Sequence, residues 1–258
     1  MSYKKLELTS RNAVVMGGTS GIGLALAKGL AQAGANVIAT GRRVNLVEAV
    51  TEEIRRAGGK SLAIACDVGD ATSIEAVLQG ATKEWGGVDI LVNAAGITKR
   101  GPTMDVAMSD WNAILDTNLN GTLRSCQIFG RHMIERKYGR IVNIGSLGST
   151  LALYEVAAYC ASKAAVAALT KSLAIEWARY GVCVNAIVPG VFRTEMSSKL
   201  LDGTGRGAEF LQRTPMSRFG HLDELVGAAV FLSSEAASFV TGHLLAVDGG
   251  ILASGVNQ

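Results

Sequence analysis

Short β-prone runs alternate with helix-length amphipathic segments along almost all of the 258 residues, and this alternation constrains the fold more than any other feature. Strands joined by helical crossovers pair in parallel, with the helices packed on the faces of the sheet. The β-prone runs are 13–16, 36–40, 61–66, 90–92, 140–144, 182–188 and 244–247. We therefore predict an α/β fold with a doubly wound parallel sheet of about seven strands and helices on both faces.

Nothing in the sequence divides the chain into smaller units. It has no linker, low-complexity stretch or internal repeat, and 48% of its residues are hydrophobic, which is enough for one large core. We expect residues 1–258 to form a single catalytic domain. The irregular segment 193–219, which carries three glycines and Pro215 after a predicted strand end, is a candidate substrate lid.

Charge and cysteine usage exclude several classes of partner. The net charge is only +3 and no basic run exceeds two residues, so we expect neither nucleic acid nor a membrane surface as a partner. The four cysteines are too widely spaced for a metal site or a compact disulfide scaffold, and no apolar run reaches the roughly 18 residues of a membrane span. These features favour a cytoplasmic protein with reduced thiols and no metal.

A glycine-rich turn follows the first predicted strand and precedes a helix-like segment. Gly17, Gly21 and Gly23 allow a tight turn and a close approach of the backbone to a pyrophosphate, whose charge the helix N-terminus attracts. This context predicts a dinucleotide site in a Rossmann-type fold, although a glycine turn alone also occurs in ordinary strand-to-helix connections. The predicted cofactor contacts in the turn are Gly17, Thr19, Ser20, Gly21, Ile22 and Gly23.

The end of the second predicted strand indicates the nucleotide preference. An NAD-binding chain usually has an acidic residue here for the adenosine ribose, but this chain has Arg42 and Arg43. Two guanidiniums favour the extra phosphate of NADP(H) over NAD(H). Two alternatives remain: the arginines belong to a solvated helix start, or one of them stacks on adenine in an NAD enzyme.

Tyr159 and Lys163 are one helical turn apart and therefore lie on the same face of a helix. A cation beside a phenol stabilises the phenolate and lowers the tyrosine pKa from about 10, which suits a general acid/base near neutral pH. The spacing alone is also common in amphipathic helices without catalytic function. The spacing indicates a catalytic pair only in combination with the other motifs of the chain.

These motifs together resemble the short-chain dehydrogenase/reductase family over nearly the whole chain. Ser146 precedes Tyr159 by 13 residues, as the family pattern requires. The matching positions are Gly17, Gly21 and Gly23 in the cofactor turn, Asp67 and Val68 beside adenine, Asn93, Ala94 and Gly96 at a strand end, Asn118, Ser146, Tyr159 and Lys163 in the active site, and Pro189, Gly190 and Thr194 beside nicotinamide.

The resemblance implies a reaction in which a ketone and a secondary alcohol are interconverted by hydride transfer. Tyr159 is expected to donate or accept the proton, Lys163 to lower the pKa of Tyr159 and bind the nicotinamide ribose, and Ser146 to donate a hydrogen bond to the substrate oxygen. The resemblance also gives Asn118 a role in holding a water that links Lys163 to solvent. The family is commonly tetrameric, and the apolar segments 164–174 and 115–128 are candidate interfaces, although burial in a monomer core explains them equally well.

The motifs do not specify the substrate. Lys99, Arg100 and Arg193 follow strand ends and are candidate ligands for a carboxylate, although solvated loop charges explain Lys99 and Arg100 equally well. Within the family the chain resembles gluconate 5-dehydrogenase-like members, which implies a sugar acid or polyol and a role in carbohydrate metabolism. A 3-oxoacyl-carrier-protein reductase and a non-catalytic cofactor-sensing or structural protein are the alternatives.

Overall fold

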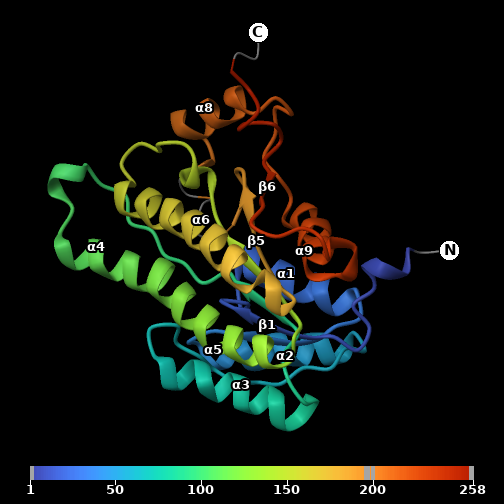
Figure 1. The fold of residues 1–258 in the computed structure, drawn as a ribbon. Helices are drawn as coiled ribbons and strands as arrows, with labels where there is room; N and C mark the ends of the chain where they lie inside the picture. The colour runs from blue at the N-terminus through green and yellow to red at the C-terminus, as the bar shows by residue number, and fades with distance from the viewer. Residues whose placement is uncertain (1–2, 195–197, 199–200, 256–258) are drawn as a thin grey trace.

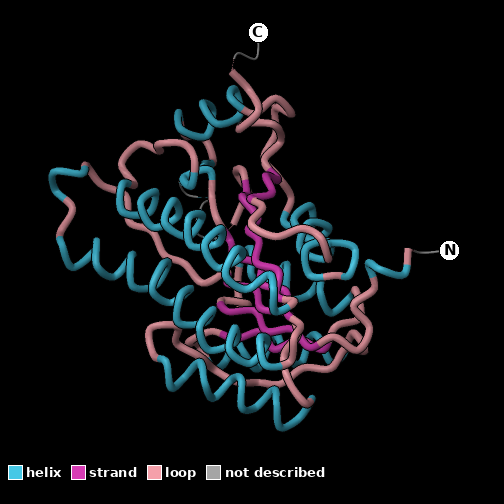
Figure 2. Tube along the Cα trace, viewed as in Figure 1, coloured by secondary structure: helices cyan, strands magenta, loops and turns pink. Residues whose placement is uncertain are grey.

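The computed structural model describes residues 3–194, 198 and 201–255, and it contains one parallel sheet with helices on both faces (Figures 1 and 2). The sheet has six strands in the order β2-β1-β3-β4-β5-β6. The strands are β1 (Asn12–Met16), β2 (Asn36–Thr40), β3 (Ile90–Asn93), β4 (Gly139–Ile144), β5 (Val182–Pro189) and β6 (Leu244–Val247). The predicted Rossmann-type α/β class is confirmed.

The prediction of a strand at 61–66 was wrong. Within this segment only Ser61 forms a bridge, to Val37 of β2. The segment still follows β2, since the Cys66 amide donates to the Gly41 carbonyl at 3.0 Å. Between these contacts, however, the Thr40 hydroxyl donates to the Ile64 carbonyl at 2.6 Å. A side chain thus supplies a contact that the backbone would make in a regular ladder, which explains why β-prone residues here do not extend the sheet.

The helices divide between the two faces of the sheet. The larger ones are α1 (Gly21–Gln32), α2 (Val44–Arg56), α3 (Ala71–Trp85), α4 (Met108–Leu115), α5 (Gly121–Glu135), α6 (Ala157–Trp177), α8 (Gly205–Arg213) and α9 (Val226–Ser233). Apolar residues of α1, α2 and α9 pack on one face, and those of α3, α5 and α6 pack on the other. Figure 1 shows α5 and α6 on the opposite side of the strands from α1 and α9.

Short helical turns connect these elements. They are η1 (Lys4–Leu6), η2 (Thr103–Asp105), η3 (Asp116–Asn120), η4 (Leu147–Ser149), η5 (Ala178–Tyr180), η6 (Leu222–Leu225) and η7 (Glu235–Ala237). The η3 segment is a π-helical turn between α4 and α5, whereas the others are 3₁₀ turns. Among the described residues, no helix has the length and apolar character needed to cross a membrane.

Both faces of the central strands are buried, which accounts for their continuous apolar sequences. In β1, Ala13 and Val15 join the core under α1 and α9, whereas Val14 and Met16 join the core under α3 and α5. The chain leaves β1 towards β2 and later returns to β3 on the other side of β1. In open α/β sheets, ligands bind beside the carboxyl ends of strands at such a switch point.

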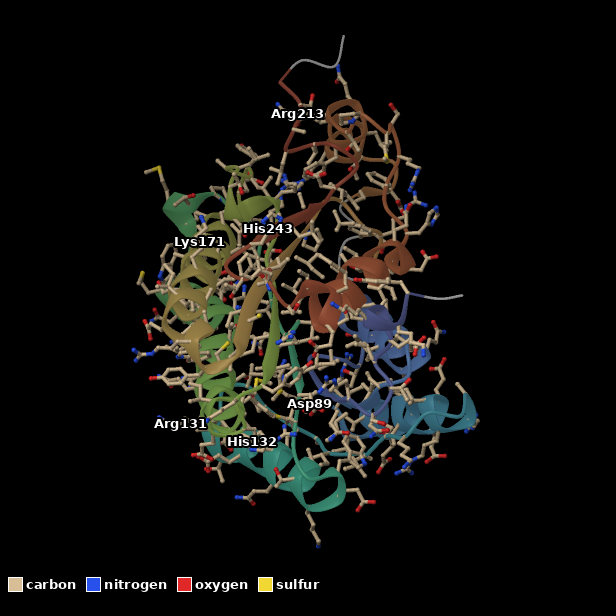
Figure 3. The ribbon with its side chains drawn as sticks, turned by 45° about the vertical axis from the view of Figure 1, so that its right-hand side comes forward. Asp89, Arg131, His132, Lys171, Arg213 and His243 are labelled. Atoms are coloured by element: carbon tan, nitrogen blue, oxygen red, sulfur yellow. The ribbon has the colours of Figure 1, made fainter. Side chains whose placement is uncertain are left out.

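The amino ends and the carboxyl ends of the strands carry different polar side chains. Asp89 precedes β3 and His132 lies on α5, so both mark the amino edge, and Figure 3 shows them at the opposite end of the molecule from Arg213 of α8. The His132 ring accepts a hydrogen bond from the Val88 amide at 3.1 Å, which is a structural contact. The glycine turn after β1 and Ser146 after β4 lie instead at the carboxyl edge.

Candidate active site

The glycine turn between β1 and α1 leaves no room for side chains at its crowded positions. Gly17 and Gly21 have positive φ angles of 76° and 52°, a backbone conformation that favours glycine. A Cβ on Gly23 would lie 2.1 Å from the Gly17 carbonyl oxygen. The first amide groups of α1 lack partners within the helix, and no acidic side chain lies in its first turn. The turn therefore has the unpartnered amides and the absence of acidic side chains that the predicted pyrophosphate site requires.

The exposed side chains of Arg42 and Arg43 lie beside this turn, after β2. A terminal nitrogen of Arg43 donates to the Ser20 hydroxyl at 3.4 Å, which brings a guanidinium to the rim of the glycine turn. On the next loop, the Asp67 carboxylate accepts from the Gly69 amide at 2.9 Å, and Val68 is buried. These residues surround the side of the turn where the adenosine half is expected.

Asn93 lies at the end of β3, as its motif predicts, and its side chain points into the core. Its side chain is buried and donates to the Asn143 amide oxygen at 2.9 Å, and Asn143 donates to the Thr170 hydroxyl of α6 at the same distance. The side chain thus connects β3, β4 and α6 within the core. Ala94 donates its amide to the Met16 carbonyl, so the strand-end backbone reaches the glycine turn.

Tyr159 and Lys163 both lie on α6, as their spacing predicts. Lys163 is only 5% exposed, and its ammonium donates to the Ile144 carbonyl at 2.7 Å. Burial lowers the pKa of Lys163 from 10.5 to about 8, because the surroundings disfavour the charged form. The sequence contains no signal for the Ile144 contact, since a backbone carbonyl carries no residue identity.

Ser146 caps the short η4 turn that follows β4. Its hydroxyl accepts from the Gly148 amide at 3.1 Å, and the Ser149 hydroxyl accepts from the Ser146 amide at 3.1 Å. Ser149 also donates to the backbone carbonyl of Lys163 at 3.0 Å, which fixes the turn against α6. The Ser-x-x-Ser spacing of a capping box was the available sequence signal for Ser149.

The Ser146 hydroxyl lies near enough to the Tyr159 phenol to influence its pKa, so the two predicted catalytic side chains are neighbours. Burial raises the pKa of Tyr159 above its ordinary value of 10.0, and the Ser146 hydroxyl offsets part of this rise. The predicted lowering of the Tyr159 pKa by the Lys163 charge does not outweigh the effect of burial in this structure. The ammonium lies 5.8 Å from the centre of the phenol ring and is hydrogen-bonded to Ile144.

Asn118 is fully buried in the π-helical turn η3. Its side-chain oxygen accepts from the Ile97 amide at 2.8 Å, and its side-chain nitrogen donates to the Ile97 carbonyl and the Ser162 hydroxyl, both at 3.0 Å. Ser162 in turn donates to the Tyr159 carbonyl. A Cβ on Gly96 would lie 3.4 Å from the Asn118 oxygen and 3.7 Å from the Lys163 nitrogen, so all three residues converge.

The segment after β5 closes the other side of the site. Gly190 donates its amide to Val247 of β6 at 2.9 Å. A Cβ on Gly21 would lie 3.6 Å from the Thr194 side chain, which places Thr194 against the glycine turn. Pro189, Gly190 and Thr194 therefore border the predicted cofactor site. Part of the candidate lid, residues 195–197 and 199–200, lies outside the described residues.

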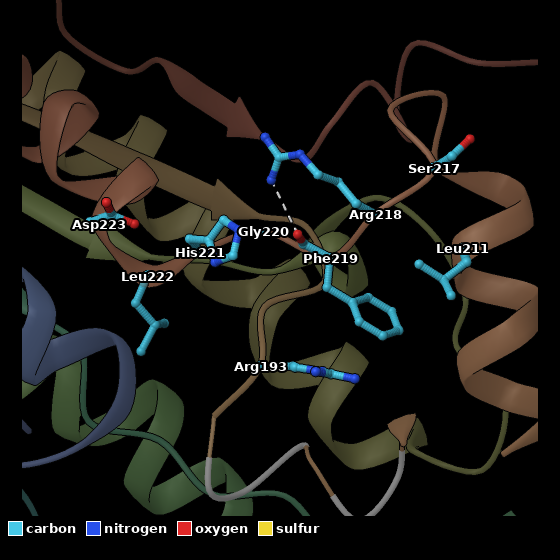
Figure 4. A pocket seen from close by; sticks show the side chains of 9 residues that line it. All are labelled: Arg193, Leu211, Ser217, Arg218, Phe219, Gly220, His221, Leu222 and Asp223. Carbon is cyan, nitrogen blue, oxygen red and sulfur yellow. Dashed lines mark hydrogen bonds between the residues drawn. The ribbon is translucent and has the colours of Figure 1, made fainter. Parts of the chain in front are cut away.

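The three candidate substrate cations each have an acidic neighbour. Lys99 pairs with Asp110 at 2.6 Å, and Arg193 pairs with Asp202 at 2.7 Å. Arg193 also lines a pocket of about 670 Å³, where its guanidinium lies near the Phe219 ring (Figure 4). Arg100 donates from Nε to Glu155 at 2.7 Å. Among the described residues, the terminal nitrogens of Arg100 have no hydrogen-bond partner.

The family follows from comparison with known proteins. Residues 17–252 match a protein-family model described as enoyl-(acyl carrier protein) reductase, which represents short-chain dehydrogenases/reductases. The chain belongs to the short-chain dehydrogenase/reductase family. It is accordingly an NAD(P)-dependent oxidoreductase that interconverts secondary alcohols and ketones.

Several relatives act on sugar acids or polyols. Gluconate 5-dehydrogenase of Gluconobacter oxydans is 42% identical over 98% of this chain and its own full length. D-threitol dehydrogenase of Mycolicibacterium smegmatis is 41% identical over 95% of this chain and 94% of the relative. The structure of a gluconate 5-dehydrogenase from Burkholderia cenocepacia, in complex with NADP and tartrate, matches with a TM-score of 0.94 and 39% identity over 97% of this chain and 98% of that one.

Proposed function

We propose that this short-chain dehydrogenase oxidises a secondary hydroxyl of a sugar acid, or reduces the corresponding ketone, with NADP(H) as the preferred cofactor. The observation that carries the catalytic assignment is the proximity of the Tyr159 phenol and the Ser146 hydroxyl on neighbouring segments, beside the buried Lys163. These groups lie at the carboxyl edge of the sheet, as does the glycine turn. A carrier-protein reductase and a non-catalytic protein agree less well with the relatives, which include several sugar-acid dehydrogenases.

Tyr159 is the general acid in reduction and the general base in oxidation. Its phenol donates a proton to the substrate oxygen or removes one from the hydroxyl. Ser146 lies beside the same phenol, and with substrate bound its hydroxyl donates to the substrate oxygen instead and stabilises the negative charge that develops there. A bound nicotinamide cofactor supplies or accepts the hydride.

Lys163 and Asn118 support this proton transfer. The Lys163 ammonium has a pKa of about 8, so it exchanges protons near physiological pH. We propose that it binds the nicotinamide ribose and supplies positive charge beside Tyr159 when the cofactor is bound. Asn118 fixes the Ile97 backbone and, through Ser162, the start of α6, and by family resemblance it holds a relay water.

The proposed preference for NADP(H) rests on Arg42 and Arg43. Both side chains are exposed, and the contact between Arg43 and Ser20 directs a guanidinium towards the glycine turn. A phosphate on the adenosine ribose would form charge-assisted hydrogen bonds with such groups. Two solved relatives contain NADP, which supports the proposal.

The proposal of an acidic substrate rests most directly on Arg100. Its terminal nitrogens are available for a carboxylate, because the contact with Glu155 uses only Nε. Lys99 and Arg193 are also retained as candidates, but each must exchange an acidic partner for the substrate. The tartrate in a solved relative is itself a hydroxy acid.

We further propose a cytoplasmic homotetramer composed of single-domain subunits, with 193–219 as a substrate lid. The composition of the α6 face that points away from the sheet is consistent with the proposed tetramer. This face exposes small residues such as Ala164 and Ala168, and Ile175 is 82% exposed. An apolar helix face of this kind is suited to packing against a second copy.

A substrate panel tests the proposal. Purified enzyme is assayed with gluconate, 5-ketogluconate, D-threitol and an acetoacetyl thioester, each with NADP(H) and NAD(H) in parallel. The expected result is the highest kcat/KM for the gluconate and 5-ketogluconate pair with NADP(H). Preferential turnover of the thioester would instead support the carrier-protein reductase, and tight cofactor binding without any turnover would support a non-catalytic protein.

A further inference from the structure

Glu155, just upstream of the helix that carries Tyr159, has an unfavourable backbone conformation. Its φ angle is 62°, in the left-handed region that few side chains other than asparagine and aspartate adopt readily. Glu155 lies four residues before Tyr159, immediately upstream of α6. Backbone strain that persists beside a catalytic residue indicates that the surrounding contacts require it.

Two contacts hold Glu155 in this conformation, and both come from the loop after β3. The carboxylate, 19% exposed, accepts from Arg100 Nε at 2.7 Å. The backbone carbonyl of Glu155 accepts from the Gly101 amide at 2.9 Å. The left-handed turn therefore presents both the side chain and the backbone of one residue to the Arg100–Gly101 segment.

This arrangement gives the Arg100 guanidinium an acidic partner on its Nε side. With Nε bound to Glu155, the two terminal nitrogens remain available for a second acceptor. A planar pair of donors matches the two oxygens of a carboxylate. The ion pairs of Lys99 and Arg193 do not have this property, because a terminal nitrogen is bound in each.

We infer that Glu155 is a positioning residue that orients Arg100 to bind the carboxylate of the substrate. The inference rests on the proposed action on a sugar acid and adds a residue that determines specificity. Glu155 does not contact the reacting atoms. It acts through Arg100, so its loss should affect acidic substrates and spare uncharged ones.

The variant Glu155→Gly tests this inference without disturbing the backbone, since glycine adopts a positive φ without strain. We expect the variant to be at least as stable as the wild type. The KM for gluconate should rise about 10-fold, because Arg100 without its Glu155 partner no longer holds the orientation that binds the carboxylate. The KM for D-threitol, the kcat values and NADP(H) binding should change less than 2-fold. Glu155→Gln keeps an acceptor for Nε and should restore most of the gluconate affinity.

A control and a double-mutant cycle separate positioning from general effects. Lys137→Gly removes a charged residue with a similar φ of 55° at the amino edge of the sheet, and it should leave both KM values unchanged. In an Arg100→Ala background, Glu155→Gly should cause no further rise in the gluconate KM.

Three outcomes would overturn the inference. An unchanged or lower gluconate KM in Glu155→Gly would exclude the positioning role while leaving the proposed function intact. Equal rises for gluconate and D-threitol would indicate a general structural effect. A wild-type enzyme that turns over D-threitol but no sugar acid would refute the proposed substrate class, and the inference with it.

Discussion

The ammonium of Lys163 donates to the carbonyl of Ile144 at 2.7 Å, and this bond joins the helix that carries Tyr159 to the strand that precedes Ser146. Ser149 makes a second connection, through its hydrogen bond to the Lys163 backbone carbonyl. The relative positions of Tyr159 and Ser146 are therefore fixed by contacts that involve a third residue. Proton transfer requires such fixed geometry.

Replacing Tyr159 with phenylalanine should abolish turnover while leaving cofactor binding nearly unchanged. The substitution removes the proton donor and leaves the ring, so we expect kcat to fall by at least about 100-fold. Steady-state kinetics measure the loss, and fluorescence titration with NADPH measures binding. Tyr180→Phe, on the short turn after α6, is the matched control and should remain fully active. Near-normal activity of Tyr159→Phe would refute the mechanism.

The buried Lys163 should make stability increase with pH in the alkaline range. Its pKa is about 8 in the folded protein and 10.5 ordinarily, so between these values the unfolded chain binds more protons than the native state. The penalty for burying the charge is therefore present below about pH 8 and is relieved as the pH rises towards about 10.5. Lys163→Met removes this dependence. Its free energy of unfolding relative to the wild type should fall by about 2 kcal/mol between about pH 7 and about pH 10. Denaturant titrations of both proteins at both pH values provide the test. A difference in the free energy of unfolding that does not change with pH would contradict the prediction.

Asn118→Ala should destabilise the protein as well as reduce its activity. The side chain is fully buried and makes three hydrogen bonds, including both backbone groups of Ile97. Losing them should reduce the free energy of unfolding by about 3 kcal/mol. Asn120→Ala, which removes an exposed contact in the same π-helical turn, should cost less than about 1 kcal/mol. Similar unfolding midpoints for the two variants would argue against the structural role of Asn118.

Gly23→Ala should eliminate cofactor binding. The added Cβ would lie 2.1 Å from the Gly17 carbonyl oxygen, so the glycine turn must open to accept it. Gly227→Ala on α9 is the control, since nothing lies within 4 Å of its added Cβ and alanine favours the helix by up to about 1 kcal/mol. Calorimetric titration with NADP measures both. Retained affinity in Gly23→Ala would show that the turn is not the pyrophosphate site.

Arg43→Ala should reduce the preference for NADP(H). Loss of one charge-assisted hydrogen bond to a phosphate should raise the KM for NADP about 10-fold and leave the KM for NAD within about 2-fold. Arg56→Ala, at the exposed far end of helix α2, which Arg43 precedes, should change neither constant. Equal effects on the two cofactors would instead indicate that Arg43 stacks on adenine, the alternative that the sequence leaves open.

The sequence predicted those features that depend on local periodicity and backbone conformation. Buried strands such as β1 are continuous apolar runs, and the spacing of Tyr159 and Lys163 defines one helical turn, so both are visible without a structure. Gly17 was predictable for a similar reason, since its positive φ favours glycine. The segment 61–66 was misassigned because β-prone residues do not reveal whether their backbone groups pair with a neighbouring strand.

Tertiary structure decided which groups from distant segments meet. The contacts between Lys163 and Ile144, and between Arg100 and Glu155, join segments on different elements, and one of them uses a carbonyl that every residue possesses. The high pKa of Tyr159 likewise results from burial, which depends on the packing of the whole domain. The sequence by itself determined the fold class, the glycine turn and the placement of Tyr159 and Lys163 on one helix, because each is set by local sequence pattern. The orientation of Arg100 and the protonation of the site come from packing between elements that are far apart in the chain.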